Sequence, residues 1–299
     1  MSIKIADLTK KYGKNIVLKS ISLEFQEETI YGLLGRNGVG KSTLLNIISN
    51  RIFKNSGEVL VDGENAEENT KAQEKIFLMS ETNLYPETMK CSEIIKWTKE
   101  FYPETDVALA FELAKKFSLD TSKKISALST GQRTIIKFIV AISSNAKYTF
   151  LDEPVLGLDA NHRALLYKTI IEEYAKNPRT IVISTHLIEE IATVIEKVVV
   201  LHDCKVVLAE STEDLLNKGY SAKGSISDIE EFVKHKNCLG IEKIGGFAVA
   251  YLLDDKPETI DENMEITGLN LQKIFIELTG GEGLEWKLKV HWSTDIKRT

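Results

Sequence analysis

The stretch Gly35-Arg36-Asn37-Gly38-Val39-Gly40-Lys41-Ser42 decides the fold, because it fits the phosphate-binding pattern G-x-x-x-x-G-K-[ST] in full. The apolar run Ile30-Tyr31-Gly32-Leu33-Leu34 precedes it, and apolar residues at helical spacing follow it from Ser42 to Ser49. Glycines let the loop backbone turn its N–H groups inward, and the positive end of the helix points at the same place. The sequence therefore predicts a strand, a phosphate-binding loop and a helix in succession.

This loop predicts ATP as the ligand and Mg²⁺ as its companion ion. Lys41 is expected to reach the β- and γ-phosphates, and the Ser42 hydroxyl is expected to ligate Mg²⁺. The predicted nucleotide-binding residues of the loop are Gly35, Arg36, Asn37, Gly38, Val39, Gly40, Lys41, Ser42 and Thr43.

A second apolar strand ends in two adjacent acids, in the run Phe150-Leu151-Asp152-Glu153-Pro154. Two carboxylates at a strand end are costly without a counter-ion. Beside a phosphate-binding loop, Asp152 is expected to act on Mg²⁺ through a water molecule or through the groups that ligate the ion, and Glu153 is expected to polarise the attacking water. The alternative interpretation is a solvated acidic turn.

The rest of the chain indicates an α/β core followed by a smaller module. Short apolar runs at 180–183 and 198–201 repeat the strand pattern, which predicts a mainly parallel sheet with helices on its faces. Residues 92–142 are mostly helical in pattern, as in an insertion, and a boundary is expected at 209–212. Beyond it we expect helices at 227–235 and 269–279, a strand at 247–253 and a strand-like tail at 286–292.

Composition limits the possible partners and compartments. The 299 residues correspond to about two domains, and the net charge of −6 argues against nucleic acid as a partner. The three cysteines, Cys91, Cys204 and Cys238, have neither disulfide nor zinc spacing. No stretch approaches the roughly 20 apolar residues of a membrane-spanning helix. We therefore expect a soluble protein of a reducing cytosol, whose membrane role would need a partner.

The run Leu128-Ser129-Thr130-Gly131-Gln132 resembles the LSGGQ signature of ATP-binding subunits of ABC transporters, and it lies upstream of the acidic strand end as in that family. Ser129 is also a good N-cap for a helix from about Gln132, and the two interpretations are compatible. Further matches to the family are the adenine-stacking aromatic at Tyr12, the D-loop Gly157-Leu158-Asp159 and the switch histidine in Ser184-Thr185-His186.

Two positions depart from the family pattern. Thr130 stands where the common signature has glycine, and Glu81 stands where the Q-loop has glutamine. A glutamate oxygen can still ligate Mg²⁺, but its charge puts the metal coordination in question.

The resemblance implies an α/β fold: a P-loop ABC ATPase core with a mixed sheet and helices on both faces. It implies a nucleotide-binding domain at 1–210, with a helical subdomain at about 85–142. A C-terminal accessory α/β domain with a flexible tail is expected at 211–299.

The resemblance also implies a site that two subunits complete. They meet head to tail around two ATPs, as a homodimer in preference to a heterodimer, and the signature of one faces the phosphate-binding loop of the other. A separate transmembrane permease would hold the chain at the cytoplasmic face of the cell membrane. The implied catalytic residues are Glu153, His186 and Lys41, the further nucleotide contacts are Tyr12, Ser129, Gly131, Gln132 and Asp159, and the metal ligands are Ser42, Glu81 and Asp152.

The architecture looks like that of ABC-2-type exporters of Gram-positive bacteria. The runs at 154–163 and 276–281 look closest to ATPases that export antimicrobial or cytolytic peptides. The alternatives are an importer ATPase, a soluble ABC ATPase acting on ribosomes or DNA, and a regulatory ATPase. The C-terminal module has two open interpretations, dimer stabilisation and regulation or partner docking.

Overall fold

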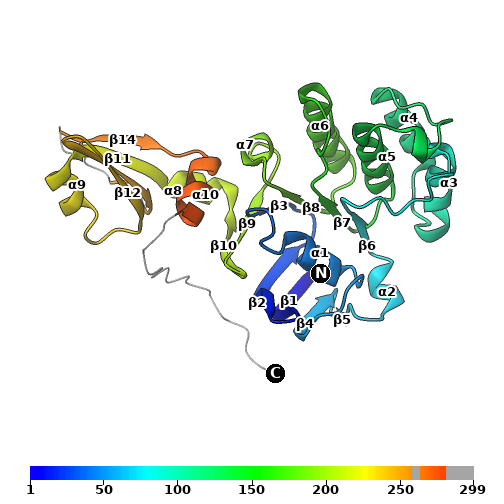
Figure 1. Cartoon of the computed structure of the whole chain (residues 1–299), viewed down its shortest axis with the longest axis horizontal. Coiled ribbons are helices and arrows are strands. Elements are labelled where there is room, and N and C mark those ends of the chain that lie inside the picture. The colour runs from blue at the N-terminus through cyan, green and yellow to red at the C-terminus, as the bar shows by residue number, and fades with distance from the viewer. Residues whose placement is uncertain (258–262, 281–299) are drawn as a thin grey trace. The chain divides into compact units, whose positions relative to one another are not determined.

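The structure is a computed structural model, and it describes residues 1–257 and 263–280. The chain divides into two compact units, Met1–Ala209 and Glu210–Thr299. The predicted strand-like tail at 286–292 lies outside the described residues. Figure 1 shows the helices and strands of both units, coloured from the N-terminus to the C-terminus.

The first unit contains a six-stranded sheet in the order β10-β9-β3-β8-β7-β6. The pairs β3–β8, β3–β9, β7–β8 and β6–β7 are parallel. Parallel strands covered on both faces are apolar throughout, and every residue of β3, β7 and β8 is buried. The strands are β3 (Ile30–Leu34), β6 (Ile76–Met79), β7 (Tyr148–Asp152), β8 (Thr180–Thr185), β9 (Lys197–His202) and β10 (Lys205–Ser211).

Helices cover both faces of this sheet. In Figure 1, α1 lies between the sheet and the N-terminal strands, and α6 lies on the opposite side. This confirms the expected α/β fold with helices on both faces. The helices are α1 (Lys41–Ile48), α6 (Ala160–Lys176) and the single turn α7 (Ile188–Ile191).

A second, antiparallel sheet in the order β2-β1-β4-β5 makes the core mixed. None of the strands expected from the sequence falls on these four strands. Register shifts interrupt the β1–β2 pairing, and Asp7 and Ser20 have positive φ, so the alternation that marks a strand is broken. The strands are β1 (Ser2–Tyr12), β2 (Asn15–Gln26), β4 (Ser56–Val61) and β5 (Glu64–Asn65).

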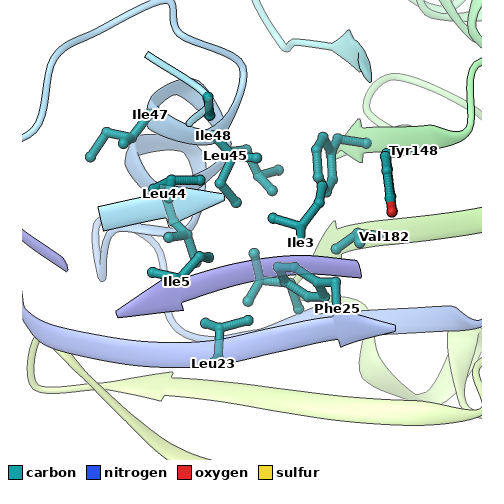
Figure 2. Close-up of a cluster of buried hydrophobic side chains, with 14 of the residues drawn as sticks. Ile3, Ile5, Leu23, Phe25, Leu44, Leu45, Ile47, Ile48, Tyr148 and Val182 are labelled. Carbon is teal, nitrogen blue, oxygen red and sulfur yellow. The ribbon is translucent and has the colours of Figure 1, made fainter. Parts of the chain in front are cut away.

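One hydrophobic cluster joins α1 to both sheets (Figure 2). Leu44 and Leu45 of α1 pack with Ile3 of β1, and Tyr148 and Val182 of the parallel sheet complete the cluster. The helix that follows the phosphate-binding loop is therefore fixed from both sides.

Three longer helices fill the region of the predicted helical subdomain. Asp106 caps α4, and α5 packs on β6 and β7, which ties this region to the sheet. The elements of this region are α3 (Cys91–Phe101), α4 (Val107–Lys116), the 3₁₀ turn η1 (Ile125–Ala127) and α5 (Thr130–Ser143), and the single turn α2 (Thr70–Gln73) precedes them.

The second unit is a four-stranded antiparallel sheet in the order β12-β13-β11-β14. The strand expected at 247–253 coincides with β13, and the two expected helices match α9 and α10 within about three residues. Strands β11, β12 and β14 were not anticipated. The elements are α8 (Thr212–Lys218), β11 (Gly219–Ser225), α9 (Ile226–Phe232), β12 (Cys238–Ile244), β13 (Phe247–Leu253), β14 (Glu265–Gly268) and α10 (Leu271–Gly280).

Candidate functional site

The loop between β3 and α1 has the backbone that its glycines predict. Gly38 and Gly40 have φ of 81° and 112°, a region that other residues rarely adopt. A Cβ on Gly40 would lie 2.8 Å from Leu18 Cδ2, and one on Gly35 would lie 2.8 Å from the Leu201 carbonyl oxygen. Only glycine fits the close approaches at Gly35 and Gly40.

A cavity of about 400 Å³ opens beside this loop. It brings together residues from the loop, from the segment after β6, and from the ends of β7 and β8. Its lining consists of Asn37, Gly38, Gly40, Lys41, Ser42, Thr43, Glu81, Glu153, Leu156 and His186. All but Leu156 are sequence-predicted site residues, and Leu156 lies in the run 154–163, which the sequence analysis used only for the family resemblance.

The three predicted catalytic side chains meet at this cavity. The Lys41 ammonium lies 3.9 Å from Glu153 Oε1 and donates to the Gly35 carbonyl oxygen at 2.7 Å. His186 Nδ1 lies 3.1 Å from both Glu153 oxygens. Burial lowers the pKa of Lys41, and the negative charges of Glu153 and Asp152 oppose that shift. The cation and the carboxylate are thus held next to each other where a phosphate would be bound.

The backbone of Glu153 is strained. Its φ is 48°, in the left-handed region that a side chain disfavours. Its N–H donates to the Ser184 carbonyl oxygen at 2.8 Å, and the Thr185 hydroxyl donates to Glu153 Oε2 at 3.3 Å. The end of β8 therefore holds a conformation that aims Glu153 into the cavity.

Asp152 provides a test of whether the site suits a cation. Its side chain is 3% exposed, and its Oδ1 has no hydrogen-bond partner in the described structure. The buried Ser184 hydroxyl also has no hydrogen-bond partner in the described structure, and Ser184 pairs with Asp152 in the β7–β8 register. Buried oxygens without donors are costly, and oxygens are what Mg²⁺ prefers. The donor set of Ser42, Glu81 and Asp152 therefore fits a hard divalent cation.

Glu81 is held by a residue that the sequence analysis did not identify. Lys137 of α5 donates to the carbonyl oxygens of Ser80 and Glu81 at 2.9 and 2.7 Å. Burial lowers the pKa of Lys137, while Glu81 and Asp152 raise it. A single charge inside an apolar helix was the only signal in the sequence.

The LSGGQ-like run forms the start of α5. Ser129 is the N-cap, and it forms a reciprocal capping box with Gln132. The helix begins at Thr130, two residues earlier than expected. A Cβ on Gly131 would lie 2.7 Å from the Gly157 carbonyl oxygen, so the signature and the loop after β7 are in close contact.

Several predicted nucleotide contacts do not line the cavity. Ser129, Gly131 and Gln132 lie at the start of α5, and Asp159 caps α6. Tyr12 is 49% exposed, with the Lys10 ammonium 4.9 Å from its ring centroid. Gly35, Arg36 and Val39 belong to the loop, and Asp152 is buried beside the cavity.

Comparison with known proteins yields a consistent set of similarities. Residues 18–156 match the family model described as "ABC transporter". The chain is 34% identical to an uncharacterized ABC transporter ATP-binding protein, MJ1023 of Methanocaldococcus jannaschii, over 72% of this chain and 80% of that protein. It is 27% identical to the ABC transporter ATP-binding protein YtrB of Bacillus subtilis, over 94% of this chain and 99% of YtrB.

The chain is also similar to a relative named for import and to a solved structure. The ribose import ATP-binding protein RbsA of Bacillus licheniformis is 32% identical over 69% of this chain, which spans 44% of RbsA. The solved structure of an ATP-binding subunit of an ABC transporter matches with a TM-score of 0.66 at 22% identity, over 72% of this chain and 92% of that one.

None of the helices in residues 1–257 and 263–280 has the length and apolar character needed to cross a membrane.

Proposed function

Because the chain belongs to the ABC transporter ATP-binding family, whose members bind and hydrolyse ATP to power transport, we propose that it drives export through a separate membrane subunit. The observation that carries this proposal is the meeting of Lys41, Glu153 and His186 at the phosphate-loop cavity. The arrangement supplies a cation for phosphate and a carboxylate that a histidine orients.

In this proposal the loop binds ATP through its backbone. The N–H groups around Gly38 and Gly40 and the start of α1 face the phosphates. Lys41 exchanges its contact with Glu153 for the β- and γ-phosphates, whose negative charge it neutralises. Tyr12 stacks on the base, and Asp159 contributes from the D-loop.

Glu153 orients the attacking water and accepts its proton. His186 holds the Glu153 carboxylate in place and contacts the γ-phosphate. Ser42, Glu81 and Asp152 would hold Mg²⁺, which when bound stabilises the charge that develops on the phosphate oxygens.

The signature completes the site of a second, identical subunit. Ser129, Gly131 and Gln132 stand away from the cavity of their own chain, and the capped N-terminus of α5 is suited to an anion. In a head-to-tail homodimer, the α5 N-terminus of one subunit therefore supplies positive partial charge to the phosphate site of the other subunit. The second unit stabilises this dimer.

The permease is proposed to dock in an apolar groove of about 280 Å³ between β6 and α3. Leu84, Trp97 and Phe101 line it and are 57–66% exposed. Its charged lining residues in the described structure are Arg51 and Lys137, both cationic. This chemistry suits an apolar helix that carries a carboxylate, and docking there would place the chain at the cytoplasmic face of the membrane.

Export, with peptides as cargo, is proposed on architecture. The second unit is part of the architecture that resembles the exporters, and the relatives named for ribose and petrobactin import match 69% and 72% of this chain. The runs at 154–163 and 276–281 resemble those of peptide-exporter ATPases. The alternative is an importer ATPase.

The test uses the chain co-purified with the membrane subunit encoded beside it and reconstituted in vesicles with the ATPase outside. An exporter should accumulate a labelled candidate peptide when ATP is added, and the Glu153→Gln variant should not. ATP-dependent release of preloaded cargo would favour import, and failure to bind any membrane subunit would contradict the transport assignment.

A further inference from the structure

Three consecutive residues form the wall between two cavities. Ser80 and Thr82 line the apolar groove, whereas Glu81 between them lines the phosphate-loop cavity. A shift of this short backbone segment would therefore change the shape of the apolar groove and of the phosphate-loop cavity together.

Lys137 holds this wall from behind. Its ammonium donates to the Ser80 and Glu81 carbonyl oxygens, and its side chain also lines the groove. The residue is only 9% exposed. Within the described part of the chain it forms no ion pair with a carboxylate inside 4.0 Å. Its two hydrogen bonds go to backbone carbonyl oxygens, and the charges of Glu81 and Asp152 act on it from beyond 4.0 Å, so its burial is costly.

The same helix carries the LSGGQ-like residues. Lys137 lies eight positions after the Ser129 cap, about two turns along α5. It therefore joins three features: the groove, the backbone of Glu81, and the helix that starts at the signature.

We propose that Lys137 is a positioning residue that aims Glu81 at the metal bound with ATP and keeps Glu81 in register with α5. The two carbonyl contacts fix the direction in which the Glu81 side chain leaves the backbone. The positive charge also offsets the negative charge that Glu81 adds where a glutamine is usual in the family. The proposal rests on the proposed function of the site as an ATP and metal site.

The test is a double-mutant cycle between Lys137→Met and Glu81→Ala in the full-length chain. Methionine keeps the length and apolar stem of lysine but cannot donate a hydrogen bond. The main readout is Mn²⁺ binding in the presence of a non-hydrolysable ATP analogue, measured by electron paramagnetic resonance. Metal-free nucleotide affinity and the unfolding midpoint are measured alongside.

Lys137→Met should weaken Mn²⁺ binding about 10-fold, in the range found when residues that orient metal ligands are removed. In the Glu81→Ala background it should have almost no further effect, because Lys137 acts through Glu81. Metal-free nucleotide affinity should stay unchanged, and Lys137→Arg should restore most of the metal affinity. The matched control is Lys116→Met, because Lys116 pairs with Glu172 and lines neither cavity.

Equal losses of Mn²⁺ affinity in both backgrounds would overturn the proposal, as would wild-type metal affinity in Lys137→Met. The proposal would also be overturned if Lys137→Met and Lys137→Arg both failed to fold while Glu81→Ala folded. Lys137 would then be needed for folding and not for positioning Glu81. Failure of the ATPase assignment is distinguishable, since the wild-type chain itself would then bind no nucleotide.

Discussion

Glu153 combines a strained backbone with a carboxylate placed between a lysine and a histidine. A left-handed φ at a side-chain-bearing residue persists only where its surroundings enforce it, and here the Ser184 carbonyl and the Thr185 hydroxyl do so. The sequence indicated which acid would matter, since Glu153 follows an apolar strand. It could not indicate the strain, which arises from the pairing of β7 with β8.

The Glu153→Gln variant should bind ATP and nearly lose turnover. The amide keeps the size of the side chain but cannot take a proton, so hydrolysis should fall by at least about 100-fold. Steady-state phosphate release and fluorescent nucleotide binding measure the two effects. Glu189→Gln, an exposed acid of α7, should keep its turnover. Wild-type-like hydrolysis by Glu153→Gln would refute the role of Glu153.

At the scale of the element, α5 shows how far the sequence could be interpreted. Ser129 was expected as a cap and is one, because a capping residue is a local signal. The contact of Lys137 with the Glu81 backbone joins residues 56 positions apart, and no local pattern encodes it. Strands β1 and β2 were missed for a related reason: their bulges are fixed by pairing with each other.

Ser129→Arg should abolish hydrolysis and spare ATP binding by the monomer. The proposed contact of Ser129 is with the nucleotide of the other subunit, so a bulky side chain should prevent closure. Ser129→Ala separates this effect from the loss of the cap, which costs about 1 kcal/mol of stability. Crosslinking of the dimer measures closure directly. If Ser129→Arg hydrolysed ATP as fast as Ser129→Ala does, the trans contact would be excluded.

At the scale of the whole molecule, one ionic cluster ties the two sheets of the first unit together. Asp62, in the β4–β5 turn, accepts from Tyr148 at 2.6 Å and pairs with Lys75 and Lys147 at 3.0 Å. Burial alone would raise the pKa of Asp62, but these three hydrogen bonds outweigh it and the net shift is downward. The cluster should therefore contribute to the stability of the unit.

Asp62→Asn should lower the free energy of unfolding by about 1–3 kcal/mol at neutral pH, because it leaves two lysines without their acid. The native pKa lies below that of the unfolded chain, so this contribution is complete above pH of about 4. It disappears as the pH falls through the native pKa. Urea titrations at several pH values measure it, and Glu24→Gln at an exposed pair should change stability by less than about 0.5 kcal/mol. A pH-independent difference would contradict the assignment.

A chain ending at Ser211 should fold and bind ATP with unchanged affinity. All lining residues of the phosphate-loop cavity belong to the unit Met1–Ala209, and Ser211 is the last residue of β10. Since the second unit is proposed to stabilise the dimer, ATP-driven dimerisation of this shortened chain should need higher protein concentrations. Light scattering and nucleotide titration test both statements. Loss of ATP binding in a folded shortened chain would show that the second unit takes part in the site.

The hydrophobic cluster around α1 also has a consequence for synthesis. Ile3 is fully buried, yet its cluster includes Tyr148 and Val182, which a ribosome adds much later. At cellular elongation rates of about 5–20 residues per second, that interval is on the order of 10 to 40 s. Throughout it, Ile3 can pack on β2, β4 and α1 but lacks the part of its cluster that the parallel sheet supplies. Nascent chains of this protein should therefore engage chaperones early and be released only after β8 has emerged.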